Sequence, residues 1–257
     1  MSGCSKVSQG CKHCYAERLW PKVAGAEAKR TGQPPRAFTD VRCHPERLDA
    51  PLHWRTPRRI FVNSMSDLFH EDVPFQFIDE VWGTMIEAPQ HQYQILTKRP
   101  ARMREYVTRY AWAGDTRITA WPLPHVWLGV SVEDQDTAIE RITLLLQTLA
   151  AVRLVSYEPA LGPVQLASSW IFDIAPRIDW LIAGGESGPN ARPAHPDWFR
   201  SVRDQCANAG VAFFFKQWGE WAPTEIHPGG PMPKMARRGK KAAGRLLDGR
   251  THDEYPA

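Results

Sequence analysis

Short apolar runs rich in Val, Ile, Leu and Phe recur along the chain, and segments with helical periodicity lie between them. Runs of this length that are bounded by polar residues are typical of buried strands. We therefore expect strands at 59–64, 93–98, 125–131, 153–158, 179–186 and 211–218, and helices at 75–88, 101–111, 134–150 and 195–210. For the helix at 134–150, the one-sided spacing predicts a packed face of Ile139, Ile142, Leu145, Leu146 and Leu149.

Strands that alternate with helices predict parallel pairing through right-handed crossovers, which is the α/β class. Six or more such units favour a TIM-type or partial (β/α) barrel of parallel strands, with a doubly wound open sheet as the alternative. The stretch 159–178 is interrupted by prolines and only loosely helical. We expect a barrel domain at 1–221, and at 222–257 an appended tail that is rich in Pro and Gly and then basic.

Composition places the chain among globular proteins, with 43% hydrophobic and 23% charged residues in a length of 257. No window approaches the ~18 uninterrupted apolar residues of a transmembrane helix, so we expect no membrane partner. The first residues lack the basic and apolar regions of a signal peptide, which predicts a cytoplasmic protein. The net charge of +4 permits a nucleic-acid partner without requiring one.

Three of the five cysteines crowd near the N-terminus as Cys4-x6-Cys11-x2-Cys14. An odd count argues against a disulfide framework, and a Cys-x2-Cys pair beside a glycine bends back on one centre, so we predict a metal site. An iron–sulfur cluster needs only these three thiolates and leaves one iron open, whereas a structural zinc needs a fourth ligand. The candidates for that ligand are His13, Cys43 and His44. Cys206 lies in a helical pattern and is predicted to be a buried apolar residue.

Each predicted strand ends in a polar cluster, and in a (β/α) barrel the carboxyl ends of the strands form the active-site face. One such ending is ordinary, but six together favour a binding site over helix caps and solvated loops. Gly184 and Gly185 would permit close backbone approach to a ligand. Phosphate-loop, serine-hydrolase and HExxH motifs are absent, which disfavours those enzyme classes. The candidate residues are Asn63, Ser64, Asp67, Lys98, Arg99, Ser131, Glu133, Glu158, Gly184, Gly185, Glu186 and Lys216.

The C-terminal segment carries a cluster of positive charge, made up of Lys234, Arg237, Arg238, Lys240, Lys241, Arg245 and Arg250. This segment is either a solvated tail or a surface that contacts nucleic-acid phosphates through counterion release. Trp218 and Trp221, near the end of the last predicted strand, are candidates for stacking on a base, with packing as the alternative.

Eight ordered blocks, among them GCKHCYAERL, RRIFVNSMSDLFHEDVP, GGESGPNARP and FFFKQWGEW, resemble the phage-associated Gp-thirty-seven/Gp-sixty-eight family, a family of unknown function. The resemblance runs from about residue 4 to residue 255. Within it, the ending Cys11-x2-Cys14-Tyr15 is similar to that of radical S-adenosylmethionine (SAM) enzymes, especially the spore photoproduct lyase-like group. Those enzymes usually space the first two cysteines by three residues, whereas six separate Cys4 from Cys11. Only three residues precede Cys4, so we expect a radical SAM-like barrel that lacks its first strand.

The radical SAM resemblance implies that Cys4, Cys11 and Cys14 hold a [4Fe–4S] cluster whose open iron binds the amino and carboxyl groups of SAM. Reduction by an external electron donor would cleave SAM to a 5′-deoxyadenosyl radical, which abstracts hydrogen from the substrate. The candidates for the SAM amino group are Asn63, Ser64 and Asp67. The candidates for its ribose and methionine ends are Ser131, Glu133 and Glu158, and Gly184, Gly185 and Glu186 resemble a SAM-binding Gly-Gly-Glu. Lys98, Arg99, Lys216 and Trp218 are candidates for an anionic substrate, such as a nucleic acid lesion or a modified base.

Two further hypotheses use the same residues differently. In one, the protein is a non-enzymatic nucleic-acid-binding protein with a structural zinc or iron–sulfur site, and the polar strand ends only cap loops. In the other, it is a metal-dependent nuclease in which Asp67, Glu133 and Glu158 are oxygen ligands. About four irons with sulfide favour the radical enzyme, and one zinc favours the binding protein.

Overall fold

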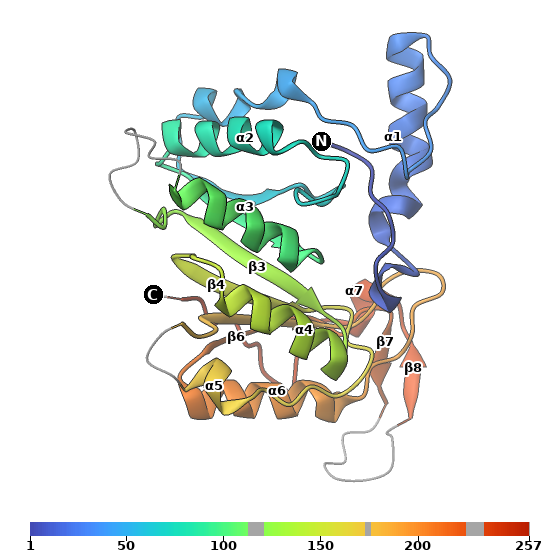
Figure 1. Cartoon of the computed structure of the whole chain (residues 1–257). Coiled ribbons are helices and arrows are strands. Elements are labelled where there is room, and N and C mark those ends of the chain that lie inside the picture. The colour runs from blue at the N-terminus through green and yellow to red at the C-terminus, as the bar shows by residue number, and fades with distance from the viewer. Residues whose placement is uncertain (113–120, 173–175, 225–233, 257) are drawn as a thin grey trace. The chain divides into compact units, whose positions relative to one another are not determined.

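The computed structural model describes residues 1–112, 121–172, 176–224 and 234–256, and its chain divides into two compact units (Figure 1). The first unit comprises Met1–Leu128 and Thr148–Ala151. The second unit comprises Gly129–Gln147 and Val152–Ala257. Each unit is described by itself below.

A six-stranded sheet is the framework of the chain, and its strands are ordered β1-β2-β3-β4-β5-β6. The strands are β1 (Arg59–Val62), β2 (Gln92–Thr97), β3 (Val126–Val132), β4 (Val152–Tyr157), β5 (Trp180–Gly184) and β6 (Ala212–Gln217). Parallel register pairs Ile60 with Tyr93, Val155 with Leu181 and Ile182 with Phe214. Spatial order follows chain order without the reversal that defines a doubly wound sheet. The predicted α/β fold with a partial (β/α)-barrel arrangement is therefore confirmed, and all six predicted strands are present.

The first unit contains the longest described helix, α1 (Tyr15–Thr31), together with α2 (Phe75–Glu87) and α3 (Pro100–Trp112) (Figure 1). Helix α1 was not predicted; it buries Ala16, Trp20 and Ala24 and ends at Gly32, whose φ of 70° is left-handed. Helix α2 buries Phe77, Ile78, Trp82 and Met85, a stripe of helical spacing that packs the unit's core. Three short 3₁₀ turns complete the unit at Gln9–Cys11, Pro45–Arg47 and Ala50–His53. None of the helices in the described parts of the chain combines the length and apolar character needed to cross a bilayer.

In the second unit, helix α4 (Gln135–Leu146) corrects one expectation from the sequence. It begins at Asp134, whose carboxylate accepts from the Thr137 amide at 3.0 Å in a capping box, but it ends before residue 150. The buried face consists of Ala138, Arg141, Ile142 and Leu145, whereas Ile139 and Leu149 are 52% and 50% exposed. The prediction was right for Ile142 and Leu145. It was wrong for Leu149 because the helix ends at Leu146, and for Ile139 because the inward face runs through Ala138 and Arg141 instead.

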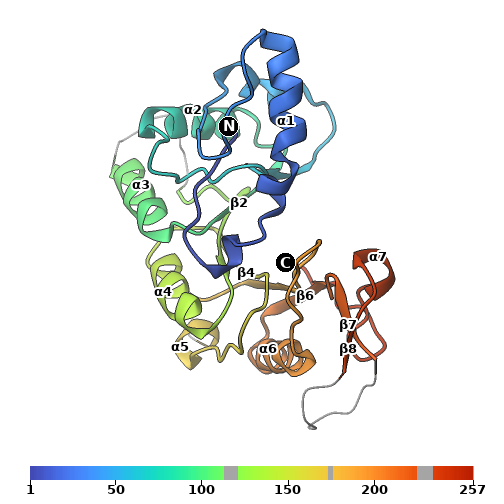
Figure 2. The same cartoon turned by 90° about the vertical axis from the view of Figure 1, so that its right-hand side faces the viewer.

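The other elements of the second unit are short, apart from helix α6 (Pro196–Ala209). Helix α5 (Ser168–Ile171) lies within the proline-containing stretch 159–178. Strand β7 (Trp221–Pro223) pairs antiparallel with β8 (Met235–Arg237), and helix α7 (Lys240–Ala243) follows β8. In Figure 2 these two strands lie beside α7. As predicted, Gly210 ends α6, with a left-handed φ of 65°.

The last described residues pack against β5 and β6. The Phe215 amide donates to the His252 carbonyl at 3.0 Å, and the Phe213 amide donates to the Glu254 carboxylate at 2.9 Å. The Trp180 and Tyr255 rings meet edge to face, with centroids 4.7 Å apart. The segment expected to be an appended tail therefore contributes to the core of the second unit.

Candidate functional site

The N-terminal cysteine loop, residues 4–14, is anchored beside the carboxyl end of β1 in the first unit. Gly3 forms a parallel bridge with Ser66, which follows β1, and its amide donates to the Met65 carbonyl at 3.3 Å. Gly3 has a φ of 93°, and a Cβ there would lie 2.6 Å from the Asp40 carbonyl oxygen, so only glycine fits. This tight approach fixes Cys4, the next residue, at the end of the strand.

All five cysteines are free thiols, and those predicted to bind metal are half-buried. Cys11 lies in the 3₁₀ turn Gln9–Cys11, and Cys14 is the N-cap of α1. Among the described residues, no three His, Cys, Asp or Glu side chains are gathered closely enough to hold a metal ion. Three reduced thiols on one loop are nevertheless the donor set that iron–sulfur clusters use, so their chemistry fits the predicted cluster.

Cys43 and Cys206, the other two cysteines, are not part of the cysteine loop. Cys206 is fully buried in α6, as predicted, and burial raises the pKa of its thiol to about 12. Cys43 is half-buried, and burial raises the pKa of its thiol. Its neighbour His44, a candidate fourth zinc ligand, bonds through Nε2 to Ser2 Oγ at 2.8 Å and through Nδ1 to Glu46 at 3.1 Å. Both nitrogens of His44 are therefore engaged within the protein.

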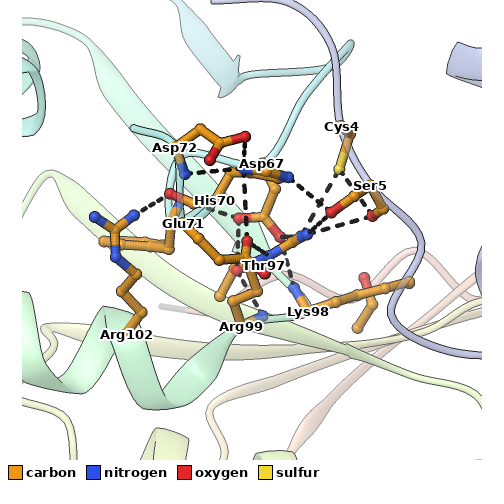
Figure 3. Close-up of polar contacts among 12 residues, drawn as sticks. Cys4, Ser5, Asp67, His70, Glu71, Asp72, Thr97, Lys98, Arg99 and Arg102 are labelled. Atoms are coloured by element: carbon orange, nitrogen blue, oxygen red, sulfur yellow. Dashed lines mark hydrogen bonds and ion pairs between the residues drawn. The ribbon is translucent and has the colours of Figure 1, made fainter. Parts of the chain in front are cut away.

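Arg99 joins the cysteine loop to the carboxyl end of β2, as Figure 3 shows. Its Nη1 lies 3.7 Å from Cys4 Sγ, and its Nη2 donates to Ser5 Oγ at 2.8 Å and to the Ser5 carbonyl at 3.3 Å. On its other side the guanidinium pairs with Asp67 at 3.2 Å and with Glu71 at 2.7 Å. The Arg99 side chain is only 8% exposed. Its charge is therefore directed at Cys4 and Ser5.

Asp67 connects the ends of β1 and β2 and is 6% exposed. One carboxylate oxygen accepts from the Phe69 amide at 3.0 Å and from Thr97 Oγ1 at 2.7 Å. The other accepts from the Lys98 amide at 3.1 Å and from Arg99 at 3.2 Å. A carboxylate has about four acceptor positions, so those of Asp67 are filled within the protein.

The electrostatics around Cys4 combine burial with the charge of Arg99. Burial raises the pKa of the Cys4 thiol, and the nearby guanidinium partly offsets this rise by stabilising the thiolate. Burial also lowers the pKa of His70, with a further lowering by Arg99. His70 Nε2 lies 2.7 Å from Ser5 Oγ.

Asn63 and Ser64 follow β1 directly and lie on the same side of the unit as this network. Asn63 adopts a left-handed φ of 61°, which is uncommon for any residue but glycine. Its side-chain amide nitrogen is buried and has no hydrogen-bond partner within the described residues. Buried polar groups are nearly always bonded, so this donor is suited to a ligand. Ser64 is exposed, and its carbonyl accepts from the Tyr15 hydroxyl.

In the second unit, the ends of β4, β5 and β6 bring together a second set of predicted residues. Glu158 accepts from Lys216 Nζ at 2.7 Å and from Gln217 Nε2 at 3.1 Å, and Gln217 also contacts Ser187 Oγ at 3.1 Å. The Glu158 side chain is 20% exposed and that of Lys216 is 49% exposed. This pair is the most accessible charged group among the predicted residues of the unit.

Two other predicted carboxylates of the second unit are buried in ion pairs with arginines. Glu133, which is fully buried, pairs with Arg141 at 3.2 Å, and Arg141 also donates to the Ser131 carbonyl at 2.6 Å. Glu186 accepts Arg192 Nη2 on one oxygen at 2.7 Å and Nε on the other at 2.9 Å. Arg141 and Arg192 are not among the residues predicted from the sequence. An arginine inside an otherwise apolar helix face is the signal that could have identified Arg141.

The predicted glycines and tryptophan serve packing. A Cβ on Gly185 would lie 2.0 Å from the carbonyl oxygen of Trp218, the residue that follows β6. The backbone of the protein itself therefore occupies the position at Gly185 where a ligand was expected to approach. A Cβ on Gly184 would meet Glu158 at 3.3 Å. The Trp218 ring is 6% exposed, packs edge-on against Phe199 and Phe215, and donates to the Leu246 carbonyl at 2.8 Å.

The comparisons with known proteins identify the family of the chain. No curated protein and no solved structure matches it. A family model described as "Protein of unknown function (DUF5131)" matches residues 1–256. The chain therefore belongs to this family of proteins of unknown function.

Proposed function

We propose that this protein is an iron–sulfur enzyme of the radical SAM type, in which Cys4, Cys11 and Cys14 hold a [4Fe–4S] cluster. The observation that carries the proposal is the contact of Cys4 with Arg99, which puts the cysteine loop at the carboxyl ends of β1 and β2. In (β/α) barrels this is the face on which active sites form. We also propose that the protein is phage-associated, as the sequence resemblance implies.

Together the cluster and SAM supply one-electron chemistry that removes a hydrogen atom from the substrate, and an external donor provides the electron. The protein's own part is to bind and orient. Asn63 offers a buried amide donor that has no partner among the residues the structure describes, and Ser64, the next residue, offers an exposed hydroxyl. Both suit polar groups of SAM, such as its carboxylate. Asp67 supports the site indirectly, since its acceptor positions already hold Thr97, Arg99 and two amides.

In the second unit, taken by itself, Glu158 is the proposed acceptor for hydroxyl groups of a ligand, because its side chain is more exposed than those of Glu133 and Glu186. Lys216, which is half-exposed beside Glu158, is the proposed contact for an anionic ligand of the second unit. Lys98 is the proposed anion contact of the first unit, considered separately. Lys234, Arg238, Lys240 and Lys241 are exposed around β8 and α7 and suit the phosphates of a nucleic acid. A cytoplasmic location is proposed because the described cysteines are all free, as in reducing compartments.

Metal analysis after anaerobic purification tests the proposal. We expect about four irons with matching sulfide per chain, and loss of both iron and brown colour in Cys11→Ala and Cys14→Ala. Cys206→Ala is the matched control, because this thiol is buried in α6, and it should keep the iron. The reduced, loaded protein should convert SAM to 5′-deoxyadenosine. Iron that survives Cys11→Ala but not Cys206→Ala would contradict the ligand assignment.

A second candidate is a non-enzymatic nucleic-acid-binding protein with a structural metal. It is favoured by the ion pairs at the strand ends, since Asp67, Glu133, Glu158 and Glu186 each have a cationic partner and can serve structure alone. One zinc per chain, with no SAM binding, would support it. A loaded cluster that neither binds nor cleaves SAM would also favour this candidate over the enzyme.

A further inference from the structure

Arg99 is the most constrained charged side chain next to the cysteine loop. Two carboxylates, Asp67 and Glu71, hold the guanidinium from one side, at 3.2 Å and 2.7 Å. Asp67 is in turn fixed by Thr97 Oγ1 at 2.7 Å and by the backbone amide of Lys98 at 3.1 Å. The fork of Arg99 therefore has little freedom to turn away from the loop.

The two terminal nitrogens of this fork also reach Cys4 and Ser5, and Nη1 is shared between Asp67 and Cys4 (Figure 3). Nη1 lies 3.7 Å from Cys4 Sγ, which is within hydrogen-bond range for a sulfur acceptor, and Nη2 donates to both oxygens of Ser5. The Ser5 hydroxyl is held a second time by His70 Nε2 at 2.7 Å. Arg99 thus contacts the loop at the Cys4 sulfur and at Ser5.

We propose that Arg99 is a positioning residue for Cys4, which sets both the place and the electron density of the sulfur that binds iron. This inference rests on the proposed function, because it takes Cys4 as a cluster ligand. An N–H donor to a ligand sulfur, and a positive charge beside it, stabilise the reduced and more negative cluster. Arg99 therefore raises the reduction potential of the cluster and slows its loss. Substrate binding, the role predicted for Arg99 from the sequence, is left to the more exposed lysines.

Arg99→Lys and Arg99→Gln separate these effects. Lysine keeps the charge but loses the planar fork, and glutamine loses the charge too. We expect the midpoint potential of both variants to become more negative, with the larger shift in Arg99→Gln. Iron loss to a chelator should accelerate by about tenfold or more, which is the range for removing a partner of a metal ligand.

Arg102→Lys is the matched control. Arg102 also sits at the start of α3 and donates to carbonyls of the β1–α2 loop, namely those of His70 and Val73, but it makes no contact with Cys4 in the described structure. It should leave the potential unchanged, whereas a purely structural effect of disturbing this loop would move both arginine variants alike.

A measurement on the wild-type protein guards against variants that fail to fold. The Fe–S stretching bands of the cysteine sulfurs should shift on transfer to deuterated water, because the N–H donor of Arg99 exchanges. A loaded protein with no such shift, or an Arg99→Lys potential equal to wild type, overturns the inference alone. A wild-type protein that takes up no iron under anaerobic reconstitution overturns the proposed function, and this role of Arg99 with it.

Discussion

Replacing the exposed basic residues around β8 and α7 tests nucleic-acid binding most directly. Lys234, Arg238, Lys240 and Lys241 are exposed, whereas Arg237 pairs with Glu220 at 3.4 Å. If all four exposed cations contact duplex phosphates, the slope of log affinity against log salt is about −3.6, from about −0.9 for each phosphate. A rise from about 50 to 200 mM salt then weakens binding by about 150-fold. On single strands, the corresponding slope of about −2.8 gives a loss of about 50-fold.

The assay is fluorescence anisotropy of a labelled oligonucleotide across this salt range, with all four residues replaced by Gln. Point substitutions are needed because His252 and Glu254 pack against β6, so deleting 234–257 would disrupt the second unit. The slope should become nearly flat in the fourfold variant. Arg237→Gln is the matched control and should keep most of it, because its charge is already paired. An unchanged slope in the fourfold variant, or no binding by wild type at the lowest salt, would refute the reasoning.

Four further predictions follow from buried groups and close contacts. Arg141→Met should cost about 3–5 kcal/mol of unfolding free energy in urea titrations, because it leaves Glu133 buried without its cation, and a double replacement with Glu133→Leu should recover most of the loss. If the single and double variants are equally unstable, the ion-pair argument is wrong. Gly185→Ala should cost about 1–3 kcal/mol or more, since its Cβ would lie 2.0 Å from a carbonyl oxygen. Gly25→Ala, where a Cβ meets nothing within 4 Å, should instead stabilise α1 by about 0.5–1 kcal/mol, and thermal melts compare the two. Burial lowers the pKa of His44 below its usual 6.5. The contribution of neutral His44 to the free energy of unfolding is therefore complete above pH 6.5 and is lost as the pH falls from there through the lower pKa of the folded state. His44→Gln should flatten this dependence of the melting temperature on pH between about pH 7 and 5.

The strands could be predicted because each is an apolar run long enough to cross a buried sheet and is bounded by polar residues. Helix α1 could not be predicted, because Pro21 and Gly25 lie within it and both residues are unfavourable in helix interiors. In addition, its apolar residues Tyr15, Leu19 and Val23 are exposed, so they do not mark the buried face. In α4, the buried Arg141 reverses the usual rule that charged residues face solvent. The pattern of isoleucines and leucines therefore identified Ile142 and Leu145 but wrongly included Ile139 and Leu149.

For the candidate site, the sequence identified which residues lie at the strand ends but not how they pair. Glu158 and Lys216 are 58 positions apart, and Asp67 and Arg99 are 32 apart, so only the sheet order brings them together. The sequence predicted a region of mixed charges open to a ligand. The structure instead matches Asp67, Glu133, Glu158 and Glu186 each to a cation, whereas the buried side-chain amide of Asn63 has no hydrogen-bond partner in the described part of the chain.

The packing of residues 252–255 against β5 and β6 has a consequence for how the chain folds during synthesis. The first unit is encoded entirely before residue 152, so its residues are available early to the growing chain. The second unit lacks the His252 carbonyl, the Glu254 carboxylate and the Tyr255 ring until residues 252–255 have been added. Domains generally fold from the N-terminus onward as they emerge. We therefore expect the cysteine loop and its Arg99 anchor to form on the ribosome before the second unit can complete its core with residues 252–255.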